Sequence, residues 1–189
     1  MDAFLASTGL VALAEIGDKT QLLSLLLAAR FRRPWPIIAG ILVATLANHA
    51  AASALGTWLT SLASPQVLRW GLGLSFLAMA AWMLVPDRAE LDESRACGCF
   101  GVFGTALIAF FLAEMGDKTQ VATIALAARF GDFMPVLLGT TAGMMLANVP
   151  AVLAGDRFGQ QLPVRMVHAV AAAIFAAIGI ALILGNAVG

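Results

Sequence analysis

The chain has little charge, no tyrosine and only two cysteines among its 189 residues. Charged residues make up 12% of it and hydrophobic residues 61%, and the mean hydropathy is +0.92. Such a composition excludes an ordinary soluble domain and indicates a polytopic membrane protein. A net charge of zero without a basic stretch argues against nucleic acid as a partner. Two thiols alone, Cys97 and Cys99, cannot make a zinc site, and we assign them no role.

Long apolar stretches follow one another along the chain. Six of them can cross roughly 30 Å of hydrocarbon, at residues 3–29, 35–59, 67–86, 101–128, 134–154 and 165–187. The sequence therefore predicts an all-α membrane protein with six transmembrane helices. The first stretch lacks the positive start of a signal peptide and continues past an acidic motif, so we expect it to remain as a helix.

The two halves of the chain align at a constant offset of 99 residues. Identical residues meet at Pro36 and Pro135, Gly40 and Gly139, Gly56 and Gly155, and Phe76 and Phe175. We therefore predict a duplicated three-helix unit, with repeats at 1–86 and 101–189. Because three is odd, the second repeat should enter the membrane from the opposite side. Inverted repeats of this kind are typical of secondary transporters, whose substrate site lies near the midplane.

Arginine placement predicts the orientation in the membrane. The first, third and fifth connections carry seven arginines, at Arg30, Arg32, Arg33, Arg88, Arg95, Arg157 and Arg165. The opposite side has only Arg69 and Arg129. The positive-inside rule then places both termini outside and an acidic linker, 87–100, in the cytoplasm. A solvated connector is the plain interpretation of this linker, and a regulatory or cation-gathering loop is the alternative.

A seven-residue motif occurs once in each half, inside an apolar stretch. It reads EIGDKTQ from residue 15 and EMGDKTQ from residue 114. A charged group at the centre of a bilayer costs roughly 2.5–3.5 kcal/mol, and six carry that cost: Glu15, Asp18, Lys19, Glu114, Asp117 and Lys118. Ion pairs that merely lock the bundle are the alternative, but intramembrane hydrogen bonds average only about 0.6 kcal/mol. The motifs therefore indicate a functional polar site.

The spacing within the motif suggests how its groups are presented. In a continuous helix, Glu15 and Asp18 face the same way, and Lys19 can partly neutralise Glu15. Gly17 permits close approach of a neighbouring helix and makes local unwinding easier. Gly116 would do the same between the acids of the second motif, and Lys118 would compensate their charge.

Crossing of the two motif helices would bring four carboxylates together, from Glu15, Asp18, Glu114 and Asp117. Such a hard-oxygen environment suits calcium, manganese or magnesium and is poor for copper or zinc. Support for the metal is possible from two glutamines and from two aligned polar residues on another helix: Gln21, Gln120, His49 and Asn148. A lone helical histidine is more often a packed residue than a ligand.

Crowded carboxylates disfavour joint ionisation, and desolvation acts in the same direction. An empty site would then hold protons, and a divalent cation would displace them. We therefore expect exchange of metal for protons, with the cation as a transported substrate and no prosthetic group.

With its twin E-x-G-D-K-T motifs, the chain resembles the family of small cation exchangers that have paired E-x-G-D-[KR]-[ST] sequences. That family includes Golgi calcium/manganese transporters of eukaryotes and manganese exporters of bacteria. The resemblance covers nearly the whole chain. It implies two inverted repeats, proton-coupled export of Mn²⁺ or Ca²⁺, and a metal site made by the motif acids. The length resembles that of a bacterial inner-membrane member.

Two other functions remain open at this point. An intramembrane aspartyl protease would use Asp18 and Asp117, but such a dyad needs two acids in different environments, and the two motifs here are alike. A passive cation channel would need a continuous polar pore, whereas the polar residues cluster at one depth.

Overall fold

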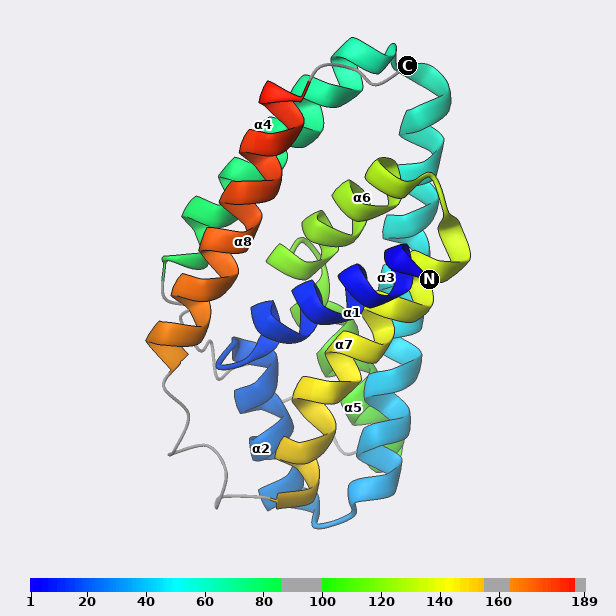
Figure 1. Cartoon of the computed structure of the whole chain (residues 1–189). Helices are drawn as coiled ribbons and strands as arrows, with labels where there is room; N and C mark the ends of the chain where they lie inside the picture. The colour runs from blue at the N-terminus through cyan, green and yellow to red at the C-terminus, as the bar shows by residue number, and fades with distance from the viewer. Residues whose placement is uncertain (86–99, 155–163, 186–189) are drawn as a thin grey trace.

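The computed structural model describes residues 1–85, 100–154 and 164–185. These residues form eight α-helices (Figure 1): α1 (Asp2–Glu15), α2 (Lys19–Phe31), α3 (Pro34–Leu62), α4 (Pro65–Met83), α5 (Gly101–Glu114), α6 (Lys118–Phe130), α7 (Phe133–Ala154) and α8 (Val164–Leu184). The all-helical prediction is thereby confirmed. The acidic linker predicted at 87–100, with Cys97 and Cys99, lies outside the described residues except for Phe100.

Two of the expected helices are each broken in two at the motif, so the prediction of continuous helices over 3–29 and 101–128 was wrong. The first breaks between Glu15 and Lys19, and the second breaks at the equivalent place. Gly17 has φ of 82° and Gly116 has φ of 79°, a left-handed conformation that glycine adopts without steric cost. Because the helix ends at Glu15, the expectation that Glu15 and Asp18 share one helical face was also wrong.

Three of the described helices are long and apolar enough to cross a membrane: α3 over Pro34–Leu62, α7 over Phe133–Leu153 and α8 over Met166–Leu184. The apolar helix α5 is shorter. A helix of 14 residues, such as α1 or α5, rises only about 21 Å, less than the roughly 30 Å of hydrocarbon. The six-span inverted arrangement therefore stays a prediction.

The two repeats pack into each other rather than side by side. Helix α3 of the first repeat packs against α5 and α6 of the second, and α7 packs against α1 and α2. A Cβ at Gly40 would lie 2.8 Å from the Phe103 carbonyl oxygen, and one at Gly139 would lie 2.6 Å from that of Phe4. These two close contacts are related by the offset of 99 residues. The repeats therefore exchange equivalent helices.

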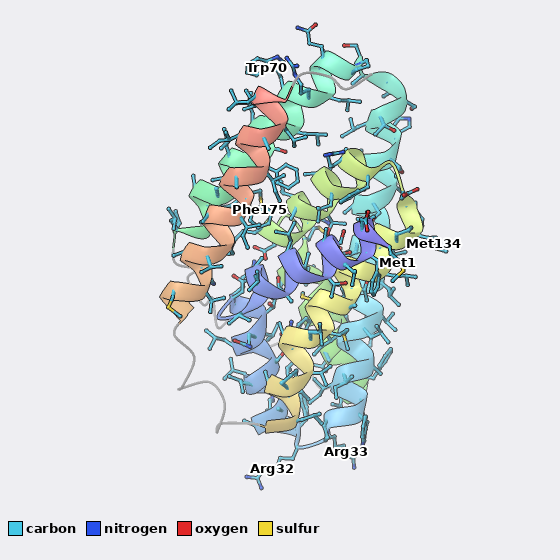
Figure 2. All side chains as sticks on the ribbon, in the orientation of Figure 1. Met1, Arg32, Arg33, Trp70, Met134 and Phe175 are labelled. Carbon is cyan, nitrogen blue, oxygen red and sulfur yellow. The ribbon has the colours of Figure 1, made fainter. Side chains whose placement is uncertain are left out.

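Helices α4 and α8, green and orange to red in Figure 1, run side by side along the remaining side of the molecule. Phe76 of α4 stacks on Phe175 of α8, with ring centroids 5.9 Å apart, and both are fully buried. Phe175 is the repeat equivalent of Phe76, so this contact joins equivalent positions of the two repeats. In Figure 2, Arg32 and Arg33 lie at one end of the molecule and Trp70 lies at the other.

Candidate metal site

Each motif bend is closed by its own glutamine. The Gly17 N–H donates to Gln21 Oε1 at 2.9 Å, and the Gly116 N–H donates to Gln120 Oε1 at 2.8 Å. These oxygens, which the sequence suggested as possible metal ligands, therefore bind backbone in the structure. The glycine permits the turn and the glutamine holds it, which fixes the direction of the acid just before the bend.

A motif threonine binds the glutamate in each repeat. Thr20 Oγ1 donates to Glu15 Oε2 at 2.6 Å, and Thr119 Oγ1 donates to Glu114 Oε2 at 2.8 Å. Both glutamates are fully buried. The other oxygen of each, Oε1, has no hydrogen-bond partner among the described residues. Buried acceptors normally have a partner, so each glutamate presents one oxygen that is available to a ligand.

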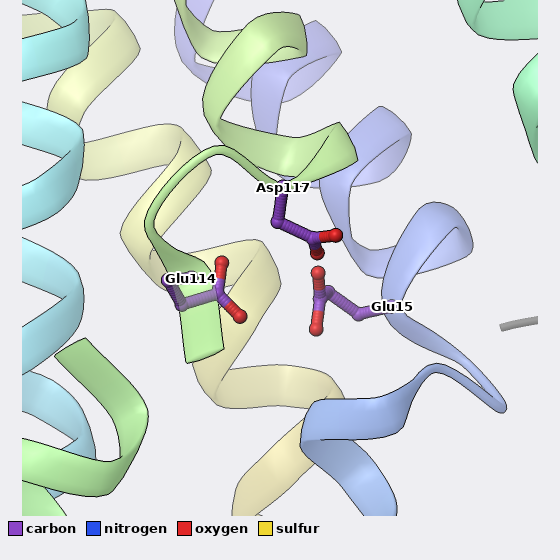
Figure 3. Close-up of side chains that lie close together, drawn as sticks. All are labelled: Glu15, Glu114 and Asp117. Atoms are coloured by element: carbon purple, nitrogen blue, oxygen red, sulfur yellow. The ribbon is translucent and has the colours of Figure 1, made fainter. Parts of the chain in front are cut away.

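Three carboxylates converge from the two repeats. One oxygen from each of Glu15, Glu114 and Asp117 lies within 4.8 Å of the others, and their side chains point toward one another in Figure 3. A Ca²⁺ ion with oxygens at roughly 2.3–2.6 Å holds opposite ligands roughly 5 Å apart. The spacing therefore suits one divalent cation. Asp18, the fourth predicted ligand, lies outside this group of three.

The motif lysines form ion pairs between the repeats. Lys19 Nζ lies 3.5 Å from Asp117 Oδ1, and Lys118 Nζ lies 3.8 Å from Asp18 Oδ1. The sequence predicted neutralisation of Glu15 by Lys19 along one helix, but the helix breaks between them. The two pairs differ in burial, because the Lys19 side chain is 31% exposed and that of Lys118 is 2% exposed.

Of the two aligned polar residues, His49 of α3 and Asn148 of α7, His49 is not part of the carboxylate group. His49 is fully buried, and neither ring nitrogen has a hydrogen-bond partner among the described residues. The Asn148 Oδ1 atom accepts from Ser24 Oγ of α2 at 2.7 Å. Asn148 therefore ties α7 to the helix that follows the first bend.

Sequence reasoning missed three residues that hold the bends. Thr20 and Thr119 stand in the motif itself, so their spacing from the glutamates was a usable signal. His168 of α8 gave no such signal, because it lies far from either motif in the sequence. Its Nε2 lies 2.8 Å from the Ile16 carbonyl oxygen. A carbonyl can only accept, so Nε2 carries the proton in this contact.

Broken helices from two repeats, with buried acids where the repeats meet, are typical of secondary cation transporters. Residues 3–91 and 102–188 match the family described as divalent cation/proton antiporter GDT1. The chain belongs to this family of membrane transporters. The protein is accordingly a transporter and not an enzyme, and a divalent cation is its substrate.

Curated relatives extend over most of the chain. A protein of Vibrio cholerae serotype O1 named "Putative manganese exporter" is 51% identical over 176 residues, covering 93% of this chain and 87% of the relative. GDT1-like protein 3 of Oryza sativa subsp. indica is 28% identical over 200 residues, covering 92% of this chain and 71% of the relative. A GDT1-like protein of Synechocystis is 29% identical over 175 residues, covering 82% of this chain and 84% of the relative. No solved structure matches the chain.

Proposed function

We propose that the protein exports Mn²⁺ from the cytoplasm in exchange for protons, using Glu15, Asp18, Glu114 and Asp117. The observation that carries this proposal is the approach of Glu15, Glu114 and Asp117 from two repeats to within 4.8 Å. Each glutamate also has one buried oxygen without a hydrogen-bond partner among the described residues. Carboxylates that converge in this way supply both a cation site and a place for protons.

The choice of metal follows from the ligand type. Histidine and cysteine contribute nothing to the described group of three, which contains carboxylates only, and hard oxygen ligands favour manganese, calcium and magnesium. The name of the Vibrio cholerae relative supports manganese. Calcium is the second candidate, because its ligand number and distances are more flexible than those of magnesium.

The charges of the two motifs support exchange of two protons for each divalent cation. Four acids and two lysines leave a net charge of −2 when all are ionised. Lys19 and Lys118 compensate Asp117 and Asp18 through their ion pairs, which leaves the two glutamates. One divalent cation or two protons would neutralise these, so both loaded forms avoid the cost of uncompensated buried charge.

We place the transporter in the bacterial inner membrane with six spans in two inverted repeats. In this arrangement α1 with α2, and α5 with α6, each form one broken span, and both termini lie outside. Arg32 and Arg33 lie at the end of the molecule opposite Trp70, which supports a cytoplasmic position for the α2–α3 turn under the positive-inside rule. Alternating access would come from one repeat rocking against the other.

Transport by purified protein in liposomes with a set pH gradient tests this function. We expect Mn²⁺ uptake that is driven by an opposing proton gradient and is accompanied by acidification of the other compartment. Parallel assays with Ca²⁺ and Mg²⁺ would rank the cations. The matched control is the double variant Glu15→Gln, Glu114→Gln, which keeps the volume of both side chains. Metal flux that ignores the pH gradient would instead indicate a passive channel.

A further inference from the structure

The two motifs have almost identical sequences but different surroundings in the structure. At the second bend, Met115 is 55% exposed and Gly116 is also exposed. At the first bend, Ile16 is only partly exposed, and its carbonyl oxygen accepts a hydrogen bond from His168. The site is therefore more open on the side of the second bend.

The lysines show the same difference. Lys19, which pairs with Asp117 beside the second bend, has a side chain that is 31% exposed, whereas that of Lys118 is 2% exposed. An ammonium group exposed to lipid is costly, so the partly open surface at Lys19 is a surface for water. Lys118 and Asp18 lie on the closed side.

The packing of helices α4 and α8 also differs between the two repeats. Helix α4 packs against α6, and α8 packs against α1. If the two repeats packed alike, α8 would pack against α2 as α4 packs against α6. In the same way, α4 would pack against α5 as α8 packs against α1. Among the described residues neither of these is a substantial contact. The α4–α8 pair therefore packs on the helix before the first bend and on the helix after the second, although the repeats offer equivalent surfaces.

The carboxylate group has the same asymmetry. Glu15 and Glu114 are repeat equivalents, and both belong to the group. Asp117 belongs to it as well, but its equivalent Asp18 does not. Asp18 lies instead beside the buried Lys118.

We propose that the metal site has a second form in which Asp18 replaces Asp117 beside Glu15 and Glu114. This inference rests on the proposed function and specifies which acids hold the cation on each side of the membrane. The second form arises when the first repeat takes up the arrangement that the second repeat has in this structure, and the second repeat takes up that of the first. The two glutamates bind the cation in both forms, and each aspartate binds it in one.

The exchange assigns roles to four more residues. In the second form Lys118 becomes accessible and Lys19 becomes buried. His168 is a positioning residue that holds the first bend closed through the Ile16 carbonyl. Its repeat equivalent is Arg69, which now donates to the Gly185 carbonyl at 3.3 Å. In the second form we expect Arg69 to donate to the Met115 carbonyl, the equivalent of Ile16.

Binding of Mn²⁺ to purified protein gives the first test. The glutamate variants Glu15→Gln and Glu114→Gln should each lose affinity by more than about tenfold, because loss of an indirect partner of a metal already costs 10–100-fold. Asp18→Asn and Asp117→Asn should each keep a site of three carboxylates and bind within about tenfold of the unmodified protein. Both aspartate variants should nevertheless stop transport in liposomes, since each removes one form of the site.

Thiol accessibility gives the second test, in a chain carrying Cys97→Ser and Cys99→Ser. A single Met115→Cys should react with an impermeant reagent from one side of the vesicle, and a single Ile16→Cys should react from the other. Adding Asp18→Asn should favour the form with Met115→Cys accessible, and adding Asp117→Asn should favour the other. His168→Leu should increase labelling of Ile16→Cys, and His168→Gln, which retains a donor, should reverse much of that increase.

Two results would overturn the exchange of aspartates. One is equal loss of Mn²⁺ affinity in all four acid variants, which would mean that four carboxylates bind at once. The other is labelling of both cysteines from the same side under every condition. If the unmodified protein binds no Mn²⁺, Ca²⁺ or Mg²⁺, the proposed function itself fails. Opposite-sided labelling would in that case still identify two forms of the molecule.

Discussion

Lys118 of the second motif lies 3.8 Å from Asp18 of the first, with both side chains 2% exposed. A buried charge without its partner is unfavourable, so each repeat depends on the other for compensation of its motif. The equivalent pair, Lys19 with Asp117, is partly open to solvent. The same chemical interaction therefore has different consequences at its two positions.

Removal of one lysine should reveal this difference in stability. We expect Lys118→Met to lower the free energy of unfolding by about 3–5 kcal/mol, because it removes one partner of the buried ion pair with Asp18. Lys19→Met should cost about 1 kcal/mol or less, since the Lys19 side chain is partly exposed and solvent screens its pair with Asp117. Thermal unfolding in detergent would measure both. The double variant Lys118→Met, Asp18→Asn should recover much of the loss; no recovery would argue against a direct pair.

The bend glycines should tolerate few substitutions. Gly116→Ala should cost about 1 kcal/mol from the left-handed backbone alone, because a Cβ there meets no atom within 4 Å. Transport should fall with it, since straightening the bend redirects Glu114. Gly116→Asn should be milder, because asparagine visits this conformation more readily. Gly71→Ala is the matched control, since it also has open space and lies within α4. Equal effects at both glycines would contradict this account.

Close packing of α7 on α1 should be sensitive to a single methyl group. Gly139→Ala would place a Cβ 2.6 Å from the Phe4 carbonyl oxygen, and overpacking of this kind costs roughly 1–3 kcal/mol. Gly9→Ala, on α1 with nothing within 4 Å, should be neutral or stabilising. Melting temperatures of the two variants in detergent would test this. A stable Gly139→Ala would show that the helices can separate there without cost.

The threonine that binds each glutamate should affect metal affinity. Thr20→Val removes the donor to Glu15 Oε2 and keeps the shape, so Mn²⁺ affinity should fall by roughly 10–100-fold. Thr20→Ser should bind nearly as well as the unmodified protein. Thr8→Val is a control, because Thr8 donates only to its own helix at Phe4. Titration of purified protein with Mn²⁺ would give these affinities, and an unchanged value for Thr20→Val would remove the threonine from the site.

Metal binding should release protons. Acid should weaken Mn²⁺ binding between about pH 8 and pH 6, because protons compete for crowded buried carboxylates. Up to two protons should leave for each Mn²⁺ bound, one from each glutamate. Calorimetry in buffers of different ionisation enthalpy would count them. Glu15→Gln should reduce the count, and release of no protons anywhere in this range would contradict proton exchange.

The apolar stretches and the duplicated motif were enough to predict an all-helical chain and its candidate acids. They were not enough to predict the helix breaks. Apolar residues continue on both sides of Glu15, so composition gives no sign of an interruption. Gly17 made unwinding easier, but only the hydrogen bond that its N–H donates to Gln21 Oε1 shows that a turn is favoured there.

Contacts between distant segments were beyond sequence reasoning for a different reason. Identical motifs predict equivalent roles, so no pattern could distinguish Asp117, within the carboxylate group, from Asp18 outside it. That difference comes from how the repeats are placed relative to each other. His168 contacts Ile16 across 152 positions of sequence separation, and a single histidine in an apolar helix does not reveal its partner.

The exchange of α3 and α7 between the repeats affects how the chain can fold and how it can have arisen. Each hydrophobic core draws residues from both halves: one joins Leu10 and Phe76 to Ala122 and Phe175, and the other joins Ile37 to Phe110. Neither half is thus an independent folding unit. A half-length ancestor would have needed a second copy of itself to bury these surfaces. Covalent fusion would have made that partnership permanent and allowed residues such as His168 and Arg69 to diverge.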